Sequence, residues 1–120
     1  QLARALCQIW EPVRDGEPAF LLLDEPVSSL DIRHQLTIMR LARNFCSRGG
    51  GVIAIMHDLN LTAMFADHMV MMKNGRVHAA GRPQDVMTDA VMENVFGCPM
   101  RVNATPADAV PFVLPHTADT

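Results

Sequence analysis

The stretch Phe20-Leu21-Leu22-Leu23-Asp24-Glu25-Pro26 decides the fold. Four large apolar residues follow one another without a polar interruption, which is typical of a strand buried on both faces inside a parallel sheet. Two adjacent carboxylates come next, and a proline ends the pattern. In open α/β sheets, ligands bind at the carboxyl ends of such strands. The stretch therefore predicts a buried strand over 20–24, with Asp24 and Glu25 at the functional edge of a sheet.

A second strand of the same kind is expected at 52–56, where another uninterrupted apolar run is followed by His57. Between the two strands, the spacing of apolar residues predicts an amphipathic helix over about 32–46, capped by Ser29 or Asp31. Strand, helix and strand together form a βαβ unit of an α/β fold. Because parallel strands end at the same edge of a sheet, His57 is expected beside the two carboxylates.

The rest of the chain predicts smaller elements and an irregular end. In chain order these are an opening helix over 1–10, a surface loop over 11–18, a helix over about 59–66, a β-hairpin of strands 69–72 and 77–80 around Asn74-Gly75, short helices over about 83–87 and 89–96, and an irregular tail over 98–120. The chain starts at Gln1, already in helical rhythm and without Met. We therefore expect the sequence to be a piece of a longer protein, and its domain to be incomplete.

Composition excludes several classes of protein. A hydrophobic content of 49% argues against disorder, and a formal net charge of −3 lacks the basic footprint of a nucleic-acid-binding protein. Apolar runs of about five residues fall far short of the roughly 20 that a membrane helix needs. The three cysteines (Cys7, Cys46 and Cys98) are far apart and odd in number, so reduced thiols are expected rather than disulfides or a metal site.

Asp24, Glu25 and His57 together suit hydrolytic phosphoryl transfer. Alternation along a strand sends the two carboxylates to different sides, so different roles are expected. One carboxylate can hold Mg²⁺, directly or through water, and the other can accept the proton of an attacking water. The imidazole can donate to the developing phosphoryl charge. The alternative is a pair of acids that merely ends a strand, with His57 as an ordinary surface residue.

Three linked motifs resemble the second half of an ATP-binding cassette (ABC) ATPase: residues 21–26 (LLLDEP), 28–31 (SSLD) and 53–58 (IAIMHD). The resemblance implies a partial P-loop NTPase (RecA-like) core of parallel strands and crossover helices, followed by the hairpin and short helices. By this resemblance, residues 1–120 are the C-terminal part of a single ABC ATPase domain. Two positions depart from the family, since Val27 stands where threonine is usual and Ser29 where alanine is usual.

The resemblance also implies roles for individual residues. Asp24 would end the Walker B strand and bind Mg²⁺ through water, and Glu25 would be the catalytic carboxylate. His57 would be the switch histidine that contacts the γ-phosphate of ATP. Ser28 and Asp31 would belong to the D-loop, which crosses a dimer interface toward the partner's nucleotide.

Other parts of an ABC ATPase are missing from the sequence. The phosphate-loop pattern G-x-x-x-x-G-K-[ST] does not occur, and the Q-loop and the signature motif are absent as well. We therefore expect the intact protein to hydrolyse ATP and the 120 residues alone to be inactive. Residues 1–6 resemble the helix that follows the signature motif.

The loop over 10–18 and the tail around 96–102 and 110–115 resemble a narrower group, the ATPase subunits of bacterial haem importers. That group implies haem uptake by a homodimer of ATPase subunits beneath two transmembrane permease subunits, with a periplasmic haem-binding protein acting indirectly. It also implies a peripheral position on the cytoplasmic face of the bacterial inner membrane. Alternatives are a siderophore or cobalamin importer ATPase, an ABC ATPase of DNA repair, and a non-catalytic interaction module. The dipeptide Cys98-Pro99 is too short to predict a haem ligand.

Overall fold

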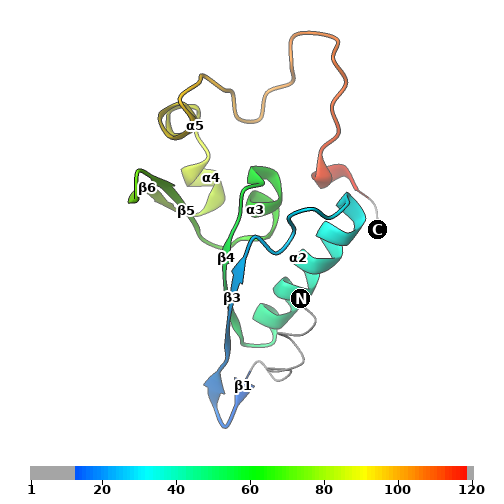
Figure 1. Cartoon of the computed structure of the whole chain (residues 1–120), viewed down its shortest axis with the longest axis vertical. Coiled ribbons are helices and arrows are strands. Elements are labelled where there is room, and N and C mark those ends of the chain that lie inside the picture. The colour runs from blue at the N-terminus through cyan, green and yellow to red at the C-terminus, as the bar shows by residue number, and fades with distance from the viewer. Residues whose placement is uncertain (1–12, 119–120) are drawn as a thin grey trace.

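The structure is a computed structural model and describes residues 13–118. The expected opening helix over 1–10 therefore lies outside the described residues. The elements are β1 (Val13–Arg14), β2 (Glu17–Pro18), β3 (Phe20–Asp24), α2 (Ile32–Ser47), β4 (Gly51–Ile55), α3 (Leu59–Phe65), β5 (Met69–Lys73), β6 (Arg76–Gly81), α4 (Pro83–Val86), α5 (Asp89–Phe96) and the 3-10 helix η1 (Pro115–Thr117) (Figure 1).

The centre of the fold is the strand–helix–strand unit that the sequence predicts. Strands β3 and β4 pair in parallel over their whole length, with Leu22 opposite Ile53. Helix α2 connects them, and its N-cap is Asp31, whose side chain accepts a hydrogen bond from the backbone N–H of His34. The helix ends at Ser47 with Arg48 as its C-cap, and the next residue, Gly49, takes a left-handed φ of 99°. The predicted α/β unit is therefore confirmed.

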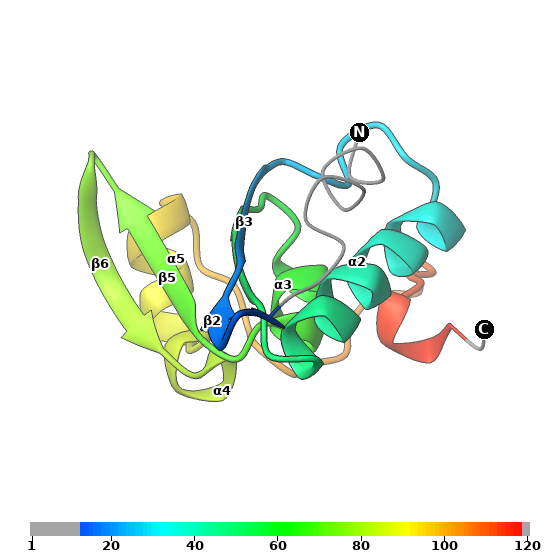
Figure 2. The ribbon, with the colours of Figure 1, turned by 90° about the horizontal axis from the view of Figure 1, so that it is seen from below.

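The two faces of the β3–β4 pair differ sharply in exposure. Leu21 is 4% exposed and packs with the fully buried Phe45 of α2. Figure 2 shows α2 and α3 on the same side of β3. The opposite face carries exposed large apolar side chains, which are Phe20, Leu22, Ile53 and Ile55. The expectation of a strand buried on both faces is wrong for this chain, because helices cover only one face of the pair.

Helices α2 and α3 pack against each other below the turn that follows β3. Their shared cluster contains Val27, Leu36, Met39 and Leu61, all buried. Helix α3 begins at the cap Asp58, whose carboxylate accepts the backbone N–H of Leu61. This packing holds the turn after β3 against the helix that follows β4. It therefore fixes the relative positions of the residues that follow the carboxyl ends of the two strands.

The β5–β6 hairpin forms the other part of the molecule, with α4 and α5 packed on it (Figure 1). Its two-residue turn has positive φ at both Asn74 (53°) and Gly75 (74°), as a type I′ turn requires. Buried Met69 and Met71 contribute to a cluster with Val86 and Met92, whereas Met72 is exposed. The predicted Asn-Gly hairpin is confirmed.

The two ends of the described chain are mostly irregular. The expected surface loop over 11–18 contains a small hairpin, β1–β2, which turns at Asp15-Gly16 with φ values of 54° and 80°. After α5 the chain makes a long excursion before η1 (Figure 1). The radius of gyration is 16.0 Å, against about 14 Å for a compact chain of this length. Within residues 13–118, no helix is both long and apolar enough to span a bilayer.

Candidate functional site

Glu25 and His57 meet at the carboxyl edge of the β3–β4 pair. Glu25 directly follows β3, and its backbone N–H donates to the carbonyl of Ile55 at 2.9 Å, which extends the ladder by one residue. His57 lies two residues beyond the end of β4. The Nε2 atom of His57 and the Oε1 atom of Glu25 form a hydrogen-bonded pair. Two residues 32 positions apart in sequence are thus brought together by a single crossover.

The backbone leaves the extended conformation of the strand at Glu25. Its φ is 50°, a left-handed conformation that residues other than glycine rarely adopt. The following turn is closed by hydrogen bonds from Ser28 N to Glu25 O (3.2 Å) and from Leu30 N to Val27 O (3.3 Å). Such backbone conformations concentrate at functional sites, where the surrounding structure holds them in place. Ser29, in the same turn, has a φ of 66°.

Asp24 occupies the last position of β3, opposite Ile55. It is exposed, and alternation along the strand places it on the same face as Phe20 and Leu22. Among residues 13–118, no hydrogen bond or ion pair engages its carboxylate. Its oxygens are therefore available to water or to a cation.

The donor set at this edge suits Mg²⁺ bound jointly by protein, water and phosphate. Asp24 and Glu25 supply carboxylate oxygens, the ligands that this hard cation prefers. In the described part of the chain, no group of three or more His, Cys, Asp or Glu side chains could hold a metal ion. Mg²⁺ ordinarily binds through one or two carboxylates, several waters and the substrate's phosphates, so the residues present fit it.

A pocket of about 140 Å³ opens beside the Glu25–His57 pair. Its lining residues are Glu25, Val27, Ser28, Ser29, Gln35, Met56, His57 and Asp58. Ser28, one of the two predicted D-loop residues, therefore shares a pocket with the proposed catalytic pair. The buried Val27 fixes the adjacent turn to the core.

Asp31, the other predicted D-loop residue, does not line this pocket. Its Oδ1 accepts the backbone N–H of His34 at 2.9 Å and lies 2.8 Å from the Nδ1 of the same residue. The backbone hydrogen bond from His34 is the largest cause that lowers the pKa of Asp31. In this structure, Asp31 therefore serves as the N-cap of α2, as one of the two expected caps.

Gln35 is a pocket residue that the sequence analysis missed. It lies in the first turns of α2, and its Nε2 donates to the carbonyl of Val27 at 3.3 Å. This bond links the helix to the turn that carries Ser28 and Ser29. Its position one helical turn after the cap Asp31 was the available signal, since that spacing points a long side chain back toward the preceding turn.

Known proteins resemble this chain over nearly its whole length. The hemin import ATP-binding protein HmuV of Rhizobium meliloti is 71% identical over 118 residues, which cover 98% of this chain and 45% of that protein. The chain thus spans less than half the length of the curated relatives it matches. No protein-family model matches the chain.

Two solved structures share its arrangement of strands and helices. One is cbiO1 of Clostridium perfringens, described as part of the ABC transporter complex cbiONQ; it is 31% identical with a TM-score of 0.54, over 66% of this chain and 32% of that chain. The other is an ATP-binding cassette of an ABC transporter in its ADP conformation, with a TM-score of 0.63 over 79% of this chain and 36% of that chain. At 22% identity, the second likeness concerns the fold alone.

Proposed function

We propose that the chain is part of an ABC ATPase domain and that the protein containing it hydrolyses ATP to drive haem uptake as a subunit of an ABC importer. The observation that carries the ATPase proposal is the hydrogen-bonded pair of Glu25 and His57 beside the available carboxylate of Asp24. The identity of 71% to a hemin import ATP-binding protein supports haem as the cargo. Siderophore and cobalamin importer ATPases are the alternatives to test.

Glu25 acts as the acceptor for a proton of the attacking water. As a carboxylate it offers only acceptor oxygens, and one of them is oriented by His57. The water oxygen forms a bond to the γ-phosphorus while the bond from that phosphorus to the bridging oxygen of ADP breaks. The pocket beside Glu25 has room for the attacking water, since about 140 Å³ exceeds the roughly 30 Å³ that one water occupies.

His57 has two tasks in this proposal. With Nε2–H donated to Glu25, it fixes the direction of the catalytic carboxylate. Its side chain is 77% exposed, so a γ-phosphate oxygen that approaches from solvent can reach the ring. Because a neutral imidazole carries a single N–H, donation to that oxygen requires either the doubly protonated ring, through Nδ1–H, or a shift of the Nε2–H bond from Glu25 to the phosphate. A donor placed at this oxygen stabilises the charge that develops in the transition state.

Asp24 would hold Mg²⁺ through a water molecule. The ion, when bound, would supply positive charge that offsets the charge of the phosphates. Ser28 and Asp31 would face the nucleotide of a partner subunit across a dimer interface. The 120 residues contain no G-x-x-x-x-G-K-[ST] pattern, and in this proposal a phosphate loop elsewhere in the protein would cradle the phosphates.

The assembly that we propose is a homodimer of ATPase subunits attached to two transmembrane permease subunits. A periplasmic haem-binding protein would deliver cargo to the permease without touching this chain. The ATPase subunits would lie on the cytoplasmic face of the bacterial inner membrane as peripheral components, and ATP and Mg²⁺ would be their cofactors. A DNA-repair ATPase is less well supported, because the net charge of −3 offers no basic footprint.

The substitution Glu25→Gln in the full-length protein tests the catalytic role. It keeps the size of the side chain and removes the proton acceptor, so kcat should fall by about 10²–10⁴-fold. Glu17→Gln, an exposed carboxylate on β2, is the matched control and should leave kcat unchanged. A Glu25→Gln variant with more than half of the parent activity would overturn the role of Glu25.

The cargo is tested separately with the complete transporter. Uptake of haem, a ferric siderophore and cobalamin should be compared in the same vesicles, with Glu25→Gln as the inactive reference. Haem uptake that depends on Glu25 supports the whole proposal. Uptake of only one of the other two cargoes would refute haem import and leave the ATPase proposal intact.

A further inference from the structure

The segment over 68–84 is the basic part of a chain whose formal net charge is −3. It contains no Asp or Glu. Its cationic or titratable side chains are Lys73, Arg76, Arg82, His68 and His78. This segment forms the β5–β6 hairpin and its flanks, outside the strands that carry Glu25 and His57.

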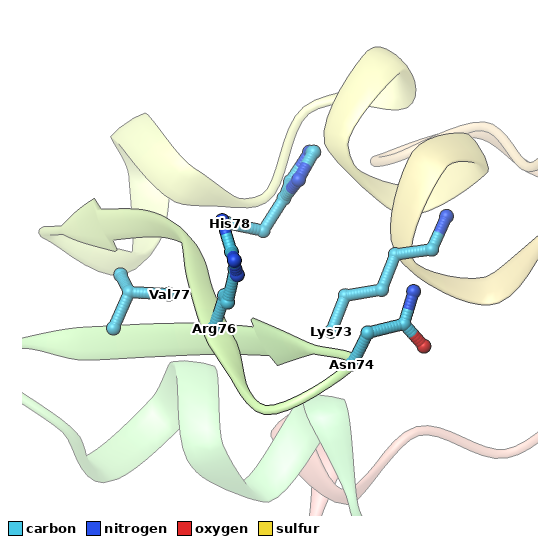
Figure 3. A pocket seen from close by; sticks show the side chains of 5 residues that line it. All are labelled: Lys73, Asn74, Arg76, Val77 and His78. Atoms are coloured by element: carbon cyan, nitrogen blue, oxygen red, sulfur yellow. The ribbon is translucent and has the colours of Figure 1, made fainter.

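A pocket of about 390 Å³ lies along this hairpin. We call it the hairpin pocket, and it is lined by Lys73, Asn74, Arg76, Val77 and His78. Figure 3 shows Lys73 reaching from the end of β5 toward α5, with Arg76 and His78 following on β6. Three of its five lining residues are basic and none is acidic, so the pocket favours an anion.

An irregularity in the strand pairing singles out His78. Met71 pairs with Ala79, but the next residue of β5, Met72, pairs with Val77. His78 is thereby left without a partner across the hairpin. Extra residues of this kind are common near functional sites, where they redirect a side chain. Here the irregularity lies within the pocket lining.

The cations of this segment differ in whether they already have partners. The Nζ of Lys73 donates to the carbonyl of Asn94 near the end of α5. Arg82 pairs with Asp85 at 2.8 Å, and the hydrogen bond that its Nε–H donates to Asp85 is the main reason that the pKa of Arg82 is raised. Among residues 13–118, no hydrogen bond or ion pair engages the side chain of Arg76 or His78. These two are therefore the donors available to a ligand.

We propose that the hairpin pocket binds a phosphate group, presented either by a small phosphate compound or by the headgroup of an anionic phospholipid. The guanidinium of Arg76 offers a planar set of donors that suits two oxygens of one phosphate. The imidazole of His78 and the amide of Asn74 add donors at the same pocket. The site is separate from the proposed ATPase centre, so it holds or fails independently of the ATPase proposal.

The test uses the full-length protein with Mg²⁺ and saturating ADP, so that the nucleotide site is filled. Inorganic phosphate binding is measured by calorimetry, and vesicle binding by sedimentation with phosphatidylglycerol or with phosphatidylcholine alone. The double variant Arg76→Gln/His78→Gln should bind the phosphate-bearing probe about tenfold more weakly. Arg82→Gln is the matched control, because it removes a cation of the same segment that already has a partner; its binding should change by less than about twofold.

Each outcome decides the proposal. Tenfold loss for inorganic phosphate identifies a small-phosphate site, and the same loss for phosphatidylglycerol vesicles alone identifies a headgroup site. An equal loss of binding in the double variant and in Arg82→Gln would show that only the total positive charge of the segment matters. That result would overturn the proposal. The absence of binding to both probes by the parent protein would also overturn it. Unchanged ATPase activity and melting temperature in the double variant confirm that its fold is intact.

Discussion

Leu21 and Leu22 are neighbours on β3 that should respond in opposite ways to the same substitution. Leu21 is 4% exposed and contacts Phe45, whereas Leu22 is 77% exposed. Leu21→Ala removes buried atoms and leaves a cavity, so it should lower the free energy of unfolding by about 2–5 kcal/mol. Full burial of a leucine is worth about 1.5–3 kcal/mol, and less than a quarter of Leu22 is covered; Leu22→Ala should therefore cost less than about 0.7 kcal/mol.

Urea unfolding of the 120-residue chain, followed by circular dichroism, measures both variants. The lower strand propensity of alanine affects the two adjacent positions alike, so the difference between the variants reports burial. If the chain is part of a longer ABC ATPase domain, as proposed above, the rest of that domain should cover the exposed face of β3 in the full-length protein. There, Leu22→Ala should cost about as much as Leu21→Ala. Equal costs in the 120-residue chain, or a negligible cost of Leu22→Ala in the full-length protein, would refute this account.

Two further predictions concern the turn between β3 and α2. Ser29 has a φ of 66°, so Ser29→Gly should raise the free energy of unfolding by about 1 kcal/mol in urea titrations; a loss of stability would show that the serine side chain outweighs the backbone strain. The pKa of Asp31 is lowered from 3.8 by the His34 backbone N–H, so its contribution to stability is complete above pH 3.8 and is lost as pH falls through the lowered value. In the Asp31→Asn variant, the free energy of unfolding should depend less on pH below pH 3.8. An unchanged dependence would show that the Asp31 carboxylate does not stabilise the start of α2.

The sequence was sufficient to predict the elements that depend on local signals. The apolar run before Asp24, the Asn74-Gly75 turn and Asp31, one of the two expected caps, each act through neighbouring residues, and all are found where predicted. The meeting of Glu25 and His57 also followed from the sequence, because parallel strands share one carboxyl edge. The partial ABC ATPase fold and the resemblance to haem importer ATPases are confirmed by the relatives and solved structures.

Features set by distant contacts were not predictable in the same way. Burial on both faces was inferred from the apolar run, but the run specifies only what the strand can tolerate; the exposed Leu22 shows that coverage depends on other segments. His78 is left unpaired because the pairing register of β5 and β6 shifts by one residue beside it. Composition alone does not specify this register. Gln35 enters the site because the buried Val27 holds the turn against α2. The small β1–β2 hairpin was missed although Asp15-Gly16 is a recognised turn signal.

The proposed hydrolysis of ATP has two separate structural requirements, a catalytic pair and a cradle for the phosphates. Their pairing requires only β3, the α2 crossover and β4, which are joined by a parallel ladder and a shared core. Binding of the phosphates requires a cradle whose sequence pattern is absent from these 120 residues. The left-handed backbone at Glu25 lies in the turn that the buried Val27 anchors to the core. In the proposed mechanism, the β3–α2–β4 crossover therefore supplies the geometry of the pair, and nucleotide binding supplies the phosphate on which the pair acts.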